Sequence, residues 1–215
     1  MKIHKRLIFW TVIFICSLVY FAPASIIQKF LSGNIIATGI SGTLWKGNVR
    51  TIVVDQVNIQ NISWSANPMS LFTGKIQANI SINSSNLKGQ FETIYTKSAV
   101  QARNLLLNGN LSLLMPYFEK YGLTISGQFD ANFERFDIKN GIPQKVSGTL
   151  QMYDTSILGI FPLNLGDITS IFRQQTQGQG ARINLNNDNG ELNLNGIITI
   201  DTKGAYLVDL TFSRN

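Results

Sequence analysis

The chain has 215 residues, with 18 lysines and arginines, 12 aspartates and glutamates, one histidine and one cysteine. A single cysteine excludes a disulfide within the chain, and His4 and Cys16 alone cannot form a His/Cys metal cluster or a conventional nucleophile–histidine site. Half of the net charge of +6 comes from Lys2, Lys5 and Arg6. No cluster of basic and aromatic residues follows them, which argues against nucleic-acid binding.

The first predicted element is an apolar helix. Residues 7–28 carry no charge, and 22 helical residues span about 33 Å, against a hydrocarbon core of about 30 Å. We therefore expect a transmembrane anchor over residues 7–28. The positive-inside rule makes residues 1–6, with Lys2, Lys5 and Arg6, a cytoplasmic stub and places residues 29–215 outside the cytoplasm. The apolar side chains of the anchor include Leu7, Ile8, Phe9, Trp10, Val12, Ile13, Phe14, Ile15, Leu18 and Val19.

The alternative is a secretory signal peptide that is cleaved. Ala22-Pro23-Ala24 has the A-x-A pattern of a cleavage site. The bulky Tyr20 and Phe21 just before it, and the length of the apolar run, favour an uncleaved anchor. Both alternatives export the rest of the chain.

Beyond the apolar run, apolar and polar residues alternate with a period of two. The pattern is clear in residues 76–83, 124–134, 145–152, 183–194 and 206–211. Such segments are typical of antiparallel strands with one apolar and one polar face. Asn140-Gly141, Asn189-Gly190 and residues 201–204 predict tight turns between strands, whereas Asn195-Gly196 lies inside a strand pattern and predicts a bulge or kink.

Helical signals are short. They predict one turn at Asn67-Pro68, with asparagine as cap, a second segment over residues 111–118, and a third turn formed by Ile168, Ile171 and Phe172 after Asp167. None of these can cover a sheet of roughly ten strands, so the apolar faces must meet one another.

We therefore predict a mainly β protein: an N-terminal transmembrane helix followed by a largely antiparallel β domain over residues 29–215. A sandwich, a closed barrel and a curled sheet with an apolar concave face all meet the packing requirement. A recurring strand glycine favours the curled sheet, a groove or half-open sandwich, because it lets a strand bend or a neighbouring backbone approach. It occurs at Gly42, Gly89, Gly127 and Gly148.

The most distinctive motif is Ser-Gly-Thr-Leu-Trp-Lys-Gly at residues 41–47. Its tryptophan, and a second one at position 64, are either partner-contact residues or core side chains under the first hairpin, and the core role is the simpler interpretation. The candidate structural or partner-contact residues are Gly42, Thr43, Leu44, Trp45, Gly47 and Trp64.

No catalytic arrangement is predicted. Asp130, Glu134 and Asp137 fit a solvated strand face better than an acid–base pair. Residues 174–180 contain two glycines but lack the lysine and helix of a phosphate-binding loop, so we expect an exposed loop there. We expect no enzymatic activity, no cofactor and no metal.

The order of several sequence blocks resembles the protein N component of the type II (general secretory pathway) secretion system of Gram-negative bacteria. The blocks are residues 20–24, residues 40–47 (Ile-Ser-Gly-Thr-Leu-Trp-Lys-Gly), residues 62–75 with Trp64 four positions before Pro68, and residues 141–150, 165–167 and 188–206.

This resemblance implies a single-pass inner-membrane protein with a periplasmic β domain. It implies an accessory role in the export of folded proteins across the outer membrane. The expected partners are other secretion components, on the inner-membrane platform or the secretin side. The family is also similar to AsmA-like β-groove proteins, some of which handle lipids. The alternative expectation is therefore a periplasmic groove that binds or transfers a lipid.

Overall fold

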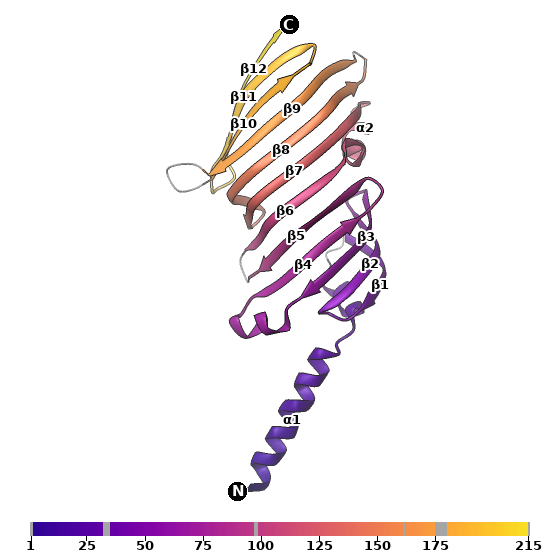
Figure 1. The fold of residues 1–215 in the computed structure, drawn as a ribbon, viewed down its shortest axis with the longest axis vertical. Coiled ribbons are helices and arrows are strands. Elements are labelled where there is room, and N and C mark those ends of the chain that lie inside the picture. Colours follow the sequence, from indigo (N-terminus) through magenta and orange to yellow (C-terminus); the bar gives the residue numbers. More distant parts are fainter. Residues whose placement is uncertain (1, 32–34, 97–98, 161, 175–179, 215) are drawn as a thin grey trace.

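The computed structural model describes residues 2–31, 35–96, 99–160, 162–174 and 180–214. An N-terminal α-helix leads into a large β-sheet with short helical turns between some strands (Figure 1). In chain order the elements are α1 (Lys2–Tyr20), η1 (Ala24–Phe30), β1 (Ile35–Gly42), β2 (Lys46–Val54), β3 (Val57–Ala66), η2 (Pro68–Thr73), β4 (Ile76–Asn83), β5 (Leu87–Tyr95), β6 (Val100–Asn110), η3 (Leu111–Leu114), α2 (Met115–Glu119), β7 (Thr124–Lys139), β8 (Ile142–Leu158), β9 (Leu163–Gln174), β10 (Ala181–Asp188), β11 (Leu192–Ile200) and β12 (Tyr206–Arg214).

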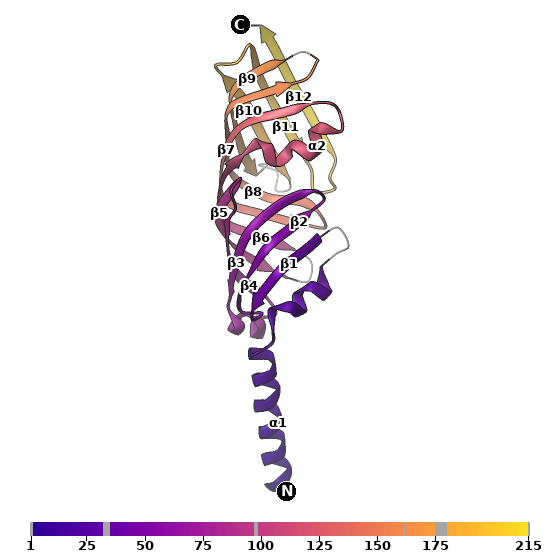
Figure 2. The same cartoon turned by 90° about the vertical axis from the view of Figure 1, so that its right-hand side faces the viewer.

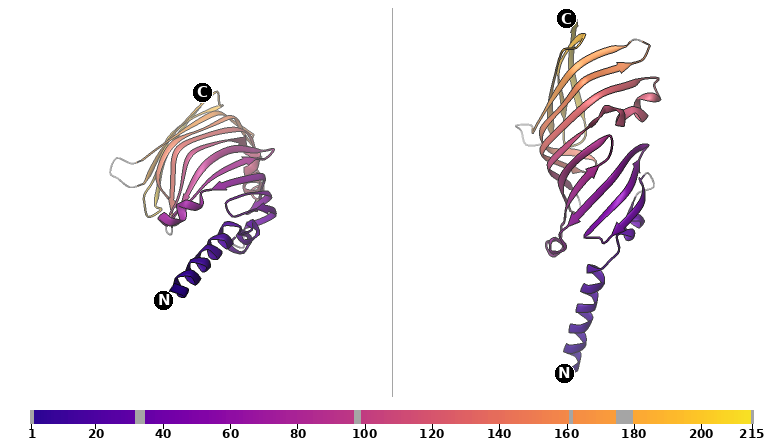
Figure 3. Two further views of the ribbon diagram at one scale, coloured as in Figure 1. Left: turned by 60° about the horizontal axis from the view of Figure 1, so that its bottom comes forward. Right: turned by 45° about the vertical axis from the view of Figure 1, so that its right-hand side comes forward.

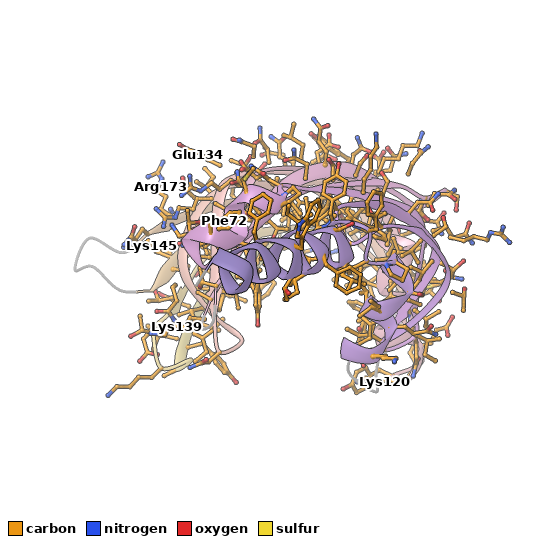
Figure 4. All side chains as sticks on the ribbon, turned by 90° about the horizontal axis from the view of Figure 1, so that it is seen from below. Phe72, Lys120, Glu134, Lys139, Lys145 and Arg173 are labelled. Atoms are coloured by element: carbon orange, nitrogen blue, oxygen red, sulfur yellow. The ribbon has the colours of Figure 1, made fainter. Side chains whose placement is uncertain are left out.

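The strands form one 12-stranded sheet in which spatial order follows chain order and neighbours pair antiparallel. Among the described strands, β1 and β12 do not pair with each other, so the sheet is open. The sheet curls into an arch. The arch is visible in the left panel of Figure 3, and Figure 4 shows it end-on, from the side of α1. The predicted curled antiparallel sheet is confirmed, with more strands than the roughly ten expected, and the closed barrel is excluded.

The two faces of the arch differ in polarity. Arg173 and Lys145 lie on its outer, convex side (Figure 4). Adjacent residues of a strand point to opposite faces, so Phe172 and Val146 belong to the inner face. Cross-strand pairs extend this apolar inner face from β3 to β11: Ile62 with Ile82, Ile80 with Phe91, Leu105 with Phe133, Ala131 with Leu150, and Ile183 with Ile198.

The inner face is packed most closely in the middle of the arch. A buried cluster of Ala131, Phe133, Val146 and Ala181 lies there, and the Phe133 and Phe172 rings meet edge to face with centroids 4.9 Å apart. Gly148 lies opposite Phe133, and a Cβ at Gly148 would overlap that ring. The predicted role of a strand glycine, close approach of a neighbour, is confirmed at this position.

Two of the three predicted helical turns are present. In η2, the Asn67 side chain accepts a hydrogen bond from the Met69 N–H (3.0 Å), and Pro68 is the first helical residue. The helices η3 and α2 together occupy residues 111–119, where the second helical segment was predicted.

Two local predictions are wrong: the third helical turn, and the bulge at Asn195-Gly196. Ile168, Ile171 and Phe172 lie in β9, whose backbone pairs with β8 and β10, so strand pairing overrides their helical spacing. At Asn195-Gly196 the register with β10 and β12 continues without a shift, so no bulge forms there. The glycine is required instead because a Cβ would overlap the backbone carbonyl oxygen of Asp209 on the neighbouring strand.

The predicted turns agree with the structure. Asn140 and Gly141 both have positive φ, 52° and 78°, as a type I′ hairpin turn requires. The turn at residues 201–204 is closed by a bond from the Asp201 N–H to the Ala205 carbonyl (2.9 Å). The loop predicted over residues 174–180 lies largely outside the described residues, which omit 175–179.

The helix α1 extends away from one end of the sheet, as the two perpendicular views show (Figures 1 and 2). It begins at Lys2, so the predicted stub belongs to its first turns, and it ends at Tyr20, before η1. Within the described part of the chain, no helix combines the length and apolarity needed to cross a membrane. The anchor over residues 7–28 stays a prediction.

Candidate functional site

The candidate residues of the glycine–tryptophan motif lie where α1 meets the sheet. Residues 43–45 form the tight connection between β1 and β2, closed by the Thr43 N–H donating to the Lys46 carbonyl (2.9 Å). Gly42 has φ of +93°, and a Cβ there would overlap the Lys46 carbonyl oxygen. The turn therefore needs glycine at this position. We call residues 42–47, together with Trp64 and the end of α1, the junction.

Trp45 connects this turn to α1. Its indole Nε1–H donates to the Val19 carbonyl (3.0 Å), and the neighbouring Leu44 N–H donates to the Ala22 carbonyl (3.0 Å). Carbonyl groups in the last turn of a helix have no partner within the regular helix pattern. The junction thus supplies hydrogen-bond donors where the helix ends.

Trp64 supports the junction from β3. Its indole Nε1–H donates to the Leu44 carbonyl (3.0 Å), and its ring lies over Gly47, where a Cβ would overlap it. The Ala66 N–H donates to the Trp45 carbonyl (2.6 Å). The structure therefore brings together all six candidate residues, and both indole N–H groups bond within the chain.

Within α1, the described apolar side chains of the predicted anchor are uncovered. Seven of them have side chains that are 42–67% exposed: Phe9, Trp10, Ile13, Phe14, Ile15, Leu18 and Val19. The other predicted residues of the segment lie in α1, but their side chains fall outside the described set: Lys2, Lys5, Arg6, Leu7, Ile8 and Val12.

Two of the three carboxylates of β7 are solvated, as the sequence predicted, and the third is not. Asp130 and Glu134 are exposed, but Asp137 is only 6% exposed. Arg135 Nη2 lies 2.6 Å from Asp137 Oδ2, and this hydrogen bond raises the pKa of Arg135. Residues 135 and 137 share a face because they are two apart in one strand, and the register shift around Glu134 puts them on the face opposite Phe133, which uninterrupted alternation does not predict.

Two exposed apolar features escaped the sequence analysis. One is the tip of η2, and the other is β12, in which all nine residues are exposed. The alternation in β12 predicted a strand but not that it ends the sheet.

In the part of the chain that the structure describes, no three His, Cys, Asp or Glu side chains are grouped as a metal site would need.

The fold and the junction define a class: an open, curled antiparallel sheet with an apolar inner face, carried on an N-terminal apolar helix. The family model described as type II secretion system (T2SS), protein N, matches residues 33–215. The chain belongs to this family, as its sequence blocks indicated. No curated protein and no solved structure matches it. Family membership assigns the chain to protein transport, as an accessory component of type II secretion.

Proposed function

We propose that this protein is an inner-membrane accessory component of the type II secretion machinery that holds a periplasmic β-arch beside other secretion components. The free edge of β12 carries the proposal, because it offers a partner a ready hydrogen-bonding surface. The anchor, the topology and the partner contact are parts of this proposal, and each has its own support.

The exposed side chains of α1 support the anchor. An uncovered apolar helix is unfavourable in water and favourable in lipid. The uncharged run continues to residue 28, but residues 24–28 lie in η1 and Ala24 is buried there, so the support comes from α1. Lys2, Lys5 and Arg6 precede the run and favour a cytoplasmic N-terminus. Alkaline phosphatase fused after Asn215 should be active in cells, and an inactive phosphatase on a stable fusion would contradict this topology.

The edge of β12 supports the partner contact. Among the described strands, β12 pairs only with β11, through nine residue pairs without a shift. It contains no proline, lysine or bulge, three features that block an edge, and its charged residues are Asp209, on the outer face, and Arg214 at its end. On its inner side, Tyr206, Val208, Leu210 and Phe212 are 38–77% exposed. A strand from a partner would extend both the ladder and the apolar inner face.

The direction of the edge hydrogen bonds follows from the β11–β12 turn. The Asp201 N–H bonds to the Ala205 carbonyl, so these two residues are a hydrogen-bonded pair. Hydrogen-bonded and non-hydrogen-bonded pairs alternate along an antiparallel ladder. The residues of β12 that bond to β11 are therefore 207, 209, 211 and 213. Residues 206, 208, 210 and 212 then direct their N–H and C=O groups to the open side. Proline at position 208 should therefore block an added strand without removing a bond to β11.

The test replaces Val208 in the full-length protein in its host cell. A photo-crosslinking amino acid at Leu210 should form adducts with an identified secretion component. Val208→Pro should abolish both the adducts and secretion of the exported proteins, whereas Val208→Ala, which keeps the N–H, should preserve them. Adducts and secretion that persist at normal levels in Val208→Pro would exclude this edge as the contact.

A second candidate function, binding of a lipid chain, is favoured by the inner face. Phe129, Phe136, Leu150 and Phe172 surround the buried cluster but are themselves only partly buried. A concave apolar surface over whose centre no described helix lies offers an acyl chain a place to bind.

Adjacent residues on β9 provide the test. A photo-crosslinker at position 172 faces inward and one at position 173 faces outward. Lipid binding predicts phospholipid adducts at 172 and none at 173, detected by mass spectrometry of the protein purified from membranes. An absence of adducts at both positions would mean that the inner face fills its own space.

A further inference from the structure

The tip of η2 exposes apolar side chains that no other part of the described structure covers. Phe72 is 85% exposed, Met69 69% and Leu71 43%. We call these three residues the η2 tip. Side chains of this size are normally buried, and an apolar group rimmed by polar residues marks a contact surface.

The backbone beneath the tip is firmly held. The buried Ser70 hydroxyl donates to the Asn67 carbonyl (2.6 Å) and accepts from the Gln77 N–H (3.2 Å). Gly74, with φ of +70°, ends the turn and donates to the Leu71 carbonyl (2.9 Å). The apolar side chains are therefore displayed outward by a fixed turn whose polar groups are satisfied internally.

The η2 tip lies at the end of the sheet from which α1 leaves. In Figure 1, η2 is the helical turn at the lower left, just above the level where α1 begins its descent. In the perpendicular view of Figure 2, η2 and η1 lie on either side of the top of α1. Figure 4, seen from that end, shows Phe72 beside the helix. Whatever surrounds the upper end of α1 is therefore within reach of the tip.

The part of the chain that contains α1 and η2 is also the more basic part. Residues 7–91 contain five basic residues and one acidic residue, Asp55, whereas residues 92–215 contain ten basic and eleven acidic residues. The net charges are thus +4 and −1. Lys29 in η1 and Lys75 just after η2 are exposed. Lys75 beside the apolar tip and Lys29 across the top of α1 complement the anionic headgroups that lie above an apolar bilayer interior.

We propose that the η2 tip inserts into the outer leaflet of the bilayer that holds α1, as a second membrane contact. Met69, Leu71 and Phe72 enter the boundary between headgroups and acyl chains, while Lys29 and Lys75 contact anionic headgroups. Two contacts, α1 and η2, fix the tilt of the arch relative to the membrane, which one flexible connection would not. This inference rests on the proposed insertion of α1.

The experiment uses the full chain with Cys16→Ser, reconstituted into vesicles of phosphatidylethanolamine and phosphatidylglycerol. An environment-sensitive fluorophore is attached at Phe72→Cys, and lipids brominated in their acyl chains serve as quenchers. The matched control is Ile160→Cys, in the turn between β8 and β9 at the far end of the sheet, where the side chain is 92% exposed. Both substitutions replace an exposed apolar side chain, so neither should affect folding.

A label at Phe14→Cys in α1 separates the two proposals. We expect quenching and a blue shift at positions 14 and 72, and neither at 160. Quenching at 14 with an unquenched, water-like label at 72 would overturn the η2 contact and leave the anchor intact. Absence of quenching at 14 would overturn the anchor and with it this inference. Equal quenching at 72 and 160 would show non-specific adsorption and would also overturn it.

Discussion

At the scale of single residues, the two tryptophans of the junction show why an aromatic residue with an N–H was needed. Each indole buries part of its ring and donates to a carbonyl: Trp45 to Val19 and Trp64 to Leu44. Tryptophan and tyrosine suit positions where an apolar ring must be buried while its polar group reaches a hydrogen-bond partner. Trp45 differs from Trp64 because its bond joins α1 to the sheet.

Trp45→Phe should loosen α1 relative to the sheet. The ring remains but the bond to Val19 is lost, at a cost of about 1 kcal/mol. Limited proteolysis of the full chain in detergent should cleave residues 21–23 faster than in the parent protein. Trp64→Phe, which leaves the bond to α1 in place, is the control, and equal acceleration in both variants would contradict a specific role for Trp45.

The Arg135–Asp137 pair is the second residue-scale feature. Asp137 is buried, and within the described structure its Oδ1 has no hydrogen-bond partner, so it depends on Arg135 for compensation. Arg135→Met leaves that carboxylate unpaired and should destabilise the sheet by about 1–3 kcal/mol, less than a fully buried pair would show because the Arg135 side chain is 38% exposed.

Urea unfolding measures this loss. The double variant Arg135→Met/Asp137→Leu should recover most of the stability, because no buried charge remains. If the single and double variants unfold at the same urea concentration, the buried carboxylate is not the cause.

At the scale of elements, Asn187 ties three strands together. From β10 its Nδ2 donates to the carbonyls of Leu165 in β9 and Leu192 in β11, both at 2.7 Å. Its Oδ1 accepts from the Leu194 N–H at 2.6 Å. All three bonds are made by one buried amide, and a buried amide with complete hydrogen bonding orders the chain around it.

Asn187→Leu should lower the free energy of unfolding by about 3 kcal/mol, since it leaves three backbone groups without their partner. The matched control is Asn186→Ala, an exposed asparagine on the same strand, which should change stability by less than about 0.5 kcal/mol. Denaturant unfolding of both variants checks the prediction, and similar losses would argue against the Asn187 network.

At the scale of the whole molecule, an open sheet has no closing contacts, so stability varies along it. The longest strands, β7 and β8 with 16 and 17 residues, lie at the buried cluster, whereas β12 is exposed throughout. Local opening requires less free energy where few apolar contacts are broken.

Hydrogen exchange of the isolated protein should therefore be slowest in β7 and β8 and fastest in β12. Mass spectrometry of peptides from these strands measures the order. Binding of a partner at the β12 edge should slow exchange in β12 selectively. Protection of β12 equal to that of β8 in the unbound protein would contradict an open edge.

The sequence alone determined the local features of this protein. The period-two alternation predicted antiparallel strands with one apolar face, because side chains alternate along an extended chain. Asn140-Gly141 and Asn67-Pro68 predicted a turn and a cap, because those residues favour particular backbone angles. Residues 40–47 and the other sequence blocks were sufficient to indicate the family.

The tertiary structure alone decided everything that depends on residues far apart in the chain. Pairing with β8 and β10 made residues 168–172 a strand, although their spacing suited a helix. The register shift at Glu134 put Arg135 and Asp137 on the face opposite Phe133, where Asp137 is buried. The open curl of the sheet left one edge of β12 without a partner among the described strands and placed η2 at the end of the sheet from which α1 leaves. Alternation specifies which residues share a face, but strand partners and distant neighbours are chosen by packing free energy summed over the whole sheet.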